Sequence, residues 1–146
     1  MRDSGFLNTL AWVRLAEGKV DEAHTLAEES VTHARRRKRQ PDIIAALTVH
    51  GAVSAAAGAT AEEEALLDEA LAMAHAIPLP FEEARAHFEL GVLQTAHGDQ
   101  AAARHHFEEA QAIFARLGAQ IDQRRAEEAL GRLATLPAPE AQSALD

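Results

Sequence analysis

Apolar residues recur through most of the chain at spacings of three and four, the spacing that places side chains on one face of an α-helix. Phe88 and Val92 are four residues apart, for example, and Ile44 and Leu47 are three apart. Short polar or glycine-containing breaks separate the apolar segments. The pattern predicts helices at residues 6–17, 20–37, 43–57, 61–76, 81–97, 100–117 and 121–136.

Six of the eight glycines lie on two tracks with a period of 40 residues, and such a period is typical of repeat proteins. The first track is Gly18, Gly58 and Gly98. Each of these follows the first helix of a pair, where a residue that tolerates positive φ can end the helix. The sequence therefore predicts one repeat domain over 1–136, with units at 4–40, 41–80 and 81–118, a half unit at 119–136 and a flexible tail at 137–146.

The second track consists of Gly51, Gly91 and Gly131, which fall inside predicted helices. Glycine in a helix interior costs about 1 kcal/mol relative to alanine, so we expect a compensating contact at each of these positions. A neighbouring helix that comes too close to admit a Cβ atom would provide it. Leu67 and Phe107 share one column of the repeat and are predicted to fill the space beside these glycines.

Two of the predicted second helices carry capping signals at their starts. Asp99 directly precedes its predicted helix and is expected to be an N-cap residue. Thr60 and Glu63 have the spacing of a capping box, in which each side chain binds the backbone amide of the other residue. Both signals place a helix start immediately after the glycine turn.

The third unit resembles the tetratricopeptide repeat (TPR). The resemblance implies an all-α fold, namely a right-handed α-solenoid of about seven helices, whose first helices line a concave surface that binds a segment of a partner protein. The usual repeat has about 34 residues, and we interpret the additional ones as longer second helices and turns. Arrays of this length resemble those of bacterial LuxR-type and STAND ATPase regulators. The TPR resemblance is carried by Leu90, Gly91, Gly98, Asp99, Ala103, Phe107 and Ala110.

The composition narrows the range of functions. The chain has no Cys, which excludes disulfides and Cys-based metal centres. It also lacks a Gly-rich phosphate loop and the Gly-x-Ser-x-Gly and His-Glu-x-x-His motifs of hydrolases. No stretch approaches the roughly 20 apolar residues of a membrane span. We therefore expect a cytoplasmic protein that has no cofactor, does not contact membranes and is not an enzyme.

Five consecutive cations stand out in a chain whose net charge is −9. Positive charge at a helix C-terminus is favourable, and Pro41 blocks continuation of the helix, so the place of the run has a structural explanation. The end of a helix does not explain why five cations follow one another. A contact with nucleic acid or an acidic partner is the alternative, although the remaining surface repels nucleic acid. The basic run consists of Arg35, Arg36, Arg37, Lys38 and Arg39.

The eight histidines raise the question of a metal site. His105 and His106 are adjacent on a predicted helix and point about 100° apart, so they cannot easily share an ion. His105 and Glu109 lie on one face but supply only two ligands, where three or four are needed. No metal site is predicted.

The predicted partner-binding residues are the groove-facing positions of the first helices, carried over from the TPR resemblance. Trp12 has a second interpretation of equal weight, as core packing of the first helix. That helix is apolar nearly all round, and we expect either a second copy of this chain or the remainder of a longer parent protein to cover it. The groove-facing positions are Asn8, Trp12, Thr48, Ala52, Arg85, Phe88, Val92, Arg125 and Arg132.

Overall fold

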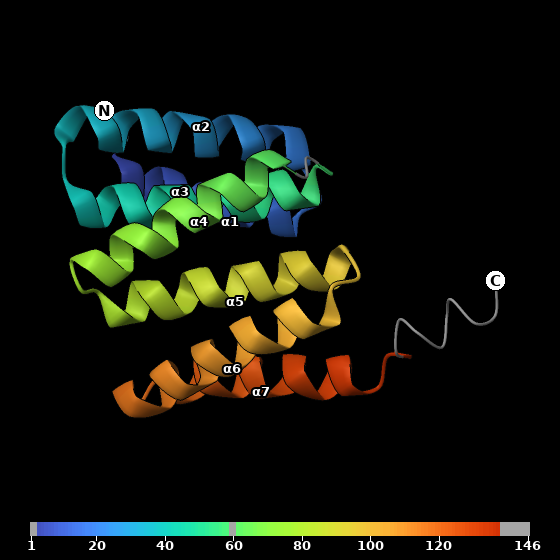
Figure 1. Ribbon diagram of the computed structural model, residues 1–146. Coiled ribbons are helices and arrows are strands. Elements are labelled where there is room, and N and C mark those ends of the chain that lie inside the picture. Colours follow the sequence, from blue (N-terminus) through green and yellow to red (C-terminus); the bar gives the residue numbers. More distant parts are fainter. Residues whose placement is uncertain (1–2, 59–60, 138–146) are drawn as a thin grey trace.

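The computed structural model describes residues 3–58 and 61–137, and within these ranges the protein consists of seven α-helices and contains no strand. The predicted all-α fold is confirmed. No helix of the described chain is both long enough and apolar enough to span a bilayer. The helices (Figure 1) are α1 Ser4–Ala16, α2 Val20–Arg37, α3 Gln40–Ala56, α4 Ala61–Ala76, α5 Pro80–Ala96, α6 Gln100–Leu117 and α7 Gln120–Ala134.

Consecutive helices pair as hairpins, and the hairpins stack along the molecule (Figure 1). Each helix packs against its neighbours in sequence. In addition, α1 packs against α3, and α3 packs against α5, so the first helices of the units form a continuous layer. This arrangement is an α-solenoid, in which each unit buries its apolar surface against the next one.

The hairpin turns have the predicted chemistry. The glycine that follows the first helix of each unit has a φ of 79° to 85°, a conformation that other residues rarely adopt. At the start of α6, the carboxylate of Asp99 accepts a hydrogen bond of 3.1 Å from the amide of Ala102, as expected for an N-cap residue. Thr60, the other predicted capping residue, lies outside the described residues. The three glycines are Gly18, Gly58 and Gly98.

Two of the three helix-interior glycines lie at close helix contacts. A Cβ atom at Gly51 would come within 2.6 Å of the Leu67 side chain, and one at Gly91 would come within 2.6 Å of the Phe107 ring. The prediction is wrong for Gly131, where a Cβ atom would meet nothing within 4 Å. Gly131 lies on α7, the last described helix, and no second helix of the same unit packs against it among the described residues.

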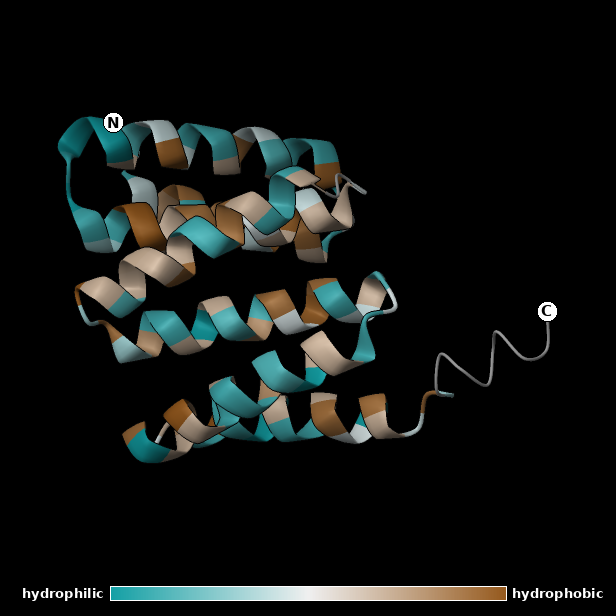
Figure 2. Ribbon diagram, in the orientation of Figure 1, coloured by the Kyte–Doolittle hydropathy of each residue, from teal (hydrophilic) through white to brown (hydrophobic). Residues whose placement is uncertain are grey.

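The most deeply buried helix is α3, because it packs against α1, α2, α4 and α5. Its residues from Ile43 to Ser54 are nearly all buried. Figure 2 shows the contrast between this largely hydrophobic helix and the largely hydrophilic α2 at the edge of the stack. Positions on α3 are therefore less available to a partner than the corresponding positions on the outer units.

Helix α1 is less exposed than its composition suggests. Leu7 and Ala11 are fully buried, and Leu10 and Leu15 pack partly against the same cluster. Its large exposed apolar side chains within the described chain include Phe6 and Val13. The predicted cover over this helix, a second copy or a parent protein, depends on these side chains and stays a prediction.

Candidate functional site

One cavity of about 260 Å³ is lined by the three consecutive helices α5, α6 and α7 and by the distant helix α1. It brings α1 and α7 together with α5 and α6, so the first and last described helices face the same space. Because side chains from both ends of the stack meet there, the layer of first helices is concave on this side. The lining residues are Trp12, Arg85, Phe88, Glu89, Phe114, Asp122 and Arg125.

The structure divides the predicted partner-binding residues into groups. Trp12, Arg85, Phe88 and Arg125 line the cavity described above, which we call the groove. Val92 and Arg132 line a separate cavity of about 350 Å³ near the end of α7, together with Thr95, Phe107, Ala129, Leu133 and Leu136.

Thr48 is a correction to the predicted set, whereas the role of Asn8 stays a prediction. Thr48 is only 2% exposed, and its hydroxyl donates a hydrogen bond of 2.9 Å to the carbonyl of Ile44 within α3. Asn8 is half-buried, and its side-chain oxygen accepts a hydrogen bond of 2.6 Å from the hydroxyl of Ser30. Ala52 is also buried. The repeat column marks the groove side of each helix, but on the central helix that side is covered by its neighbours.

Phe88 stands at the centre of the aromatic contacts in the groove. The guanidinium of Arg125 lies 5.0 Å from the centre of its ring, a distance typical of a cation–π interaction. The ring also meets that of Phe107 edge to face, with 5.5 Å between centroids. Trp12 lines the groove and also packs against the cluster around Leu7. This packing supports the core interpretation, and the role of Trp12 in partner binding stays a prediction.

Glu89 carries a perturbed carboxyl group in the groove. Burial raises its pKa from 4.5 to about 7, because charge is poorly solvated there, and the positive charges of Arg85 and Arg125 only partly oppose this effect. The side chain keeps some accessible surface, but it lies deep in the concavity, where protein atoms surround it. Near neutral pH, Glu89 is therefore partly protonated. The charged groups that line the groove are then two arginines, Asp122 and a partly ionised Glu89.

Sequence reasoning missed Glu89 and Asp122. A usable signal was nevertheless present, because Glu89 follows Arg85 by four residues and Asp122 precedes Arg125 by three. Residues at these spacings lie on the same face of a helix. Phe114 carried no such signal, since it belongs to a second helix and reaches the groove only through the packing of α6 against α5.

The basic run has several structural roles at the turn between α2 and α3. Arg35 donates two hydrogen bonds, of 3.0 and 3.2 Å, to the carboxylate of Glu69 on α4. Arg39 lies 3.4 Å from a carboxylate oxygen of Asp42. Lys38 ends α2 with a φ of 57°, the left-handed conformation that normally favours glycine. The other two arginines, Arg36 and Arg37, are exposed in the last turn of α2.

A histidine group lies between α5 and α6. The Nδ1 atoms of His87 and His106 are 3.0 Å apart, so one ring donates a hydrogen bond to the other. Burial lowers the pKa of both histidines, and each positive charge would lower the pKa of the other ring further. His105 is exposed beside them. The paired nitrogens are already satisfied by each other.

The comparisons with known proteins bear on the fold. No protein-family model matches the sequence, and no curated protein is significantly similar to it. The chain is similar to the crystal structure of BtubC (BKLC) from P. vanneervenii, with 20% sequence identity and a TM-score of 0.65. The match covers 90% of this chain and 61% of that one. At this identity the similarity shows a shared helical fold alone.

Proposed function

We propose that this chain is a non-catalytic interaction module that binds a segment of a partner protein in the groove. The observation that supports the proposal best is the meeting of Trp12 on α1 with Phe88 on α5 and Arg125 on α7 around one cavity. Tryptophan and arginine are enriched among the residues that dominate binding energy at protein interfaces. We further propose that the array is TPR-like and serves as the scaffold or sensor part of a cytoplasmic bacterial signalling or transcription regulator.

The size and charge of the groove favour a particular kind of segment. A cavity of about 260 Å³ falls just below the usual range for small-molecule sites, and it suits one anchoring side chain of a longer segment. Phe88 and Trp12 provide apolar surface for an aromatic or aliphatic anchor. Arg85 and Arg125 favour an acidic residue beside it, which would form a charge-assisted hydrogen bond.

A peptide-display selection on the immobilised chain tests this proposal. We expect enrichment of peptides that combine an apolar anchor with an adjacent acidic residue, and loss of their binding in Trp12→Ala and Arg85→Ala. Arg124→Ala is the matched control, because Arg124 is exposed on α7 and does not line the groove. Circular dichroism verifies that each variant is folded. If the enriched peptides bind both groove variants as tightly as they bind the original chain, the groove is not the binding site.

A second candidate function is supported by the basic run. Arg36 and Arg37 are exposed, and no ion pair within the described part of the chain involves either of them. This leaves positive charge available for nucleic acid or for an acidic partner surface. Binding to DNA or RNA should weaken steeply with added salt and disappear when residues 35–39 are replaced by Gln. Absence of binding at low salt would exclude nucleic acid as the partner of the basic run.

A further inference from the structure

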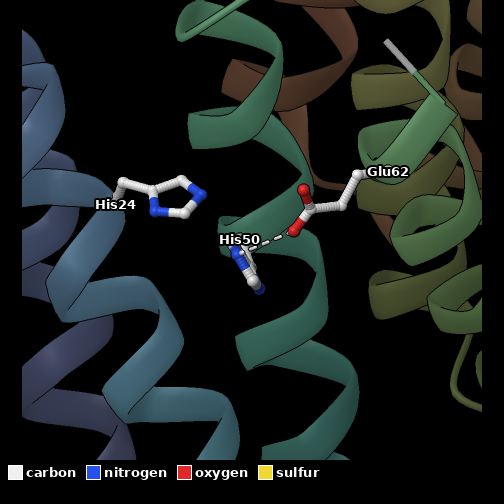
Figure 3. Close-up of side chains that lie close together, drawn as sticks. All are labelled: His24, His50 and Glu62. Carbon is white, nitrogen blue, oxygen red and sulfur yellow. Dashed lines mark ion pairs between the residues drawn. The ribbon is translucent and has the colours of Figure 1, made fainter. Parts of the chain in front are cut away.

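Three side chains that could bind a metal ion meet between the first and second hairpins. They are His24 on α2, His50 on α3 and Glu62 in the first turn of α4 (Figure 3). One potential ligand atom from each residue lies within 4.8 Å of the other two. The closest defined approach is 3.8 Å, between Nε2 of His50 and a carboxylate oxygen of Glu62.

His50 is the central member of this group and has an unusual environment. Its side chain is buried, with 7% of the residue exposed, and neither ring nitrogen has a hydrogen-bond partner in the structure. Buried polar atoms are nearly always paired, and an unpaired one calls for an explanation such as a water molecule or an ion. This observation is independent of the clustering, and it indicates that the imidazole is placed to bind something.

The orientation of His24 fits the same role. Its Nδ1 lies 3.4 Å from a carboxylate oxygen of Glu28, one turn further along α2. Figure 3 shows the other ring nitrogen, the one farther from the helix, directed toward His50. Histidines that bind metals commonly donate their second N–H to a carboxylate, which fixes the ring and makes the ligating nitrogen more basic.

We propose that His24, His50 and Glu62 bind a divalent transition-metal ion of the zinc type, with water as the remaining ligand. Two imidazoles and one carboxylate form a donor set known for Zn²⁺, whereas Ca²⁺ and Mg²⁺ prefer oxygen ligands alone. Bond lengths of about 2.0 to 2.2 Å require the ligand atoms to approach to roughly 3.3 to 3.5 Å of each other. The Glu62 side chain is 55% exposed and has room to rotate toward the two imidazoles.

An ion bound at this position would connect two units of the stack. The ligands belong to three successive helices, so a bound ion links the first hairpin to both helices of the second. Because metal binding occurs in the folded state, it stabilises the junction between these two units. The site lies apart from the groove, and it shares none of the groove's lining residues.

A calorimetric titration of the metal-free chain with Zn²⁺ alone tests the site. We expect one ion per chain and a rise in the melting temperature. Titration with Co²⁺ should give the visible absorption of a four-coordinate ion. His24→Gln and Glu62→Gln should each weaken Zn²⁺ binding at least tenfold, since even the loss of outer-shell partners costs 10- to 100-fold. These two side chains are not fully buried, so the variants should fold, which circular dichroism verifies.

The control variant is His106→Gln, in the other histidine group. It should bind Zn²⁺ as tightly as the original chain. Lack of binding by the original chain would overturn the proposal, and so would equal binding by His24→Gln and Glu62→Gln. Loss of binding in His106→Gln alone would also overturn it, because the ion would then belong to the group around His87.

Discussion

The guanidinium of Arg125 on α7 lies 5.0 Å from the centre of the Phe88 ring on α5. This contact joins the first helix of the third unit to the helix of the half unit across the groove. It also brings together a cation and an aromatic ring, two groups suited to partner recognition. The groove is therefore formed in part by an interaction between its own candidate binding residues.

A double-mutant cycle with Arg125→Ala and Phe88→Leu measures this contact. We expect a coupling free energy of about 0.5 to 1 kcal/mol, the range for a cation–π pair that is partly exposed to solvent. Urea denaturation of the four proteins provides the free energies of unfolding. The same cycle with Arg124→Ala, on the same helix, should give no coupling. Equal coupling for both arginines would mean that the contact has no specific contribution.

Gly91→Ala and Gly131→Ala form a matched pair of substitutions. Gly91→Ala should destabilise the fold by about 1 to 3 kcal/mol, because the new Cβ atom would clash with the Phe107 ring. Gly131→Ala should stabilise it by about 0.5 to 1 kcal/mol, since the position is helical and the space beside it is open. Chemical denaturation measures both. A neutral Gly91→Ala would show that Phe107 moves aside without cost.

Lys38→Gly should stabilise the protein by about 0.5 to 1 kcal/mol. Lys38 has a φ of 57°, whereas the corresponding residue two periods later is Gly118, with a φ of 71°. Glycine adopts this conformation without the steric cost that a Cβ atom imposes. Lys38→Gln, which removes the charge but keeps the Cβ atom, should leave the melting temperature nearly unchanged. A stabilisation of equal size in both variants would attribute the effect to charge.

The raised pKa of Glu89 predicts a pH-dependent contribution to stability. The folded chain holds this proton up to about pH 7, while the unfolded chain releases it near pH 4.5. Between these values the folded state binds more protons, so the contribution of Glu89 to stability falls as pH rises.

Glu89→Gln removes this titration. The stability of the variant relative to the original chain should therefore rise from pH 4.5 to 7 and then level off. The buried histidines, whose pKa is lowered, have the opposite dependence, but they are common to both proteins and cancel in the difference. Denaturation curves at several pH values measure it. A difference that does not vary with pH would mean that Glu89 titrates normally in the folded protein.

The helices and their period could be predicted from the sequence because both depend on local interactions. The predicted bounds 20–37, 61–76 and 100–117 coincide with α2, α4 and α6, since a glycine turn precedes each of these helices. The prediction was less accurate for α3, which begins at Gln40 rather than at residue 43. Pro41 lies in the first turn of this helix, where its missing N–H has no cost, and not in the turn before it.

The residues that form the groove and the proposed metal site could not be predicted in this way, because contacts between different helices bring them together. Thr48 shares a repeat column with Phe88, which lines the groove. Thr48 is nevertheless buried, because α3 lies at the centre of the stack. His24 and His50 are 26 residues apart, and Glu62 follows 12 residues later, so no motif spacing indicated that they meet.

The sequence by itself therefore determined the seven helices, their turns and the close contacts at Gly51 and Gly91. These features follow from backbone conformation and from side-chain size, which act over a few residues or one repeat. Only the tertiary structure decided which side chains share a cavity, how far burial raises the pKa of Glu89 and which histidines meet. Those properties are set by the curvature of the stack and by the low polarity of its interior, which arise when all the hairpins pack together.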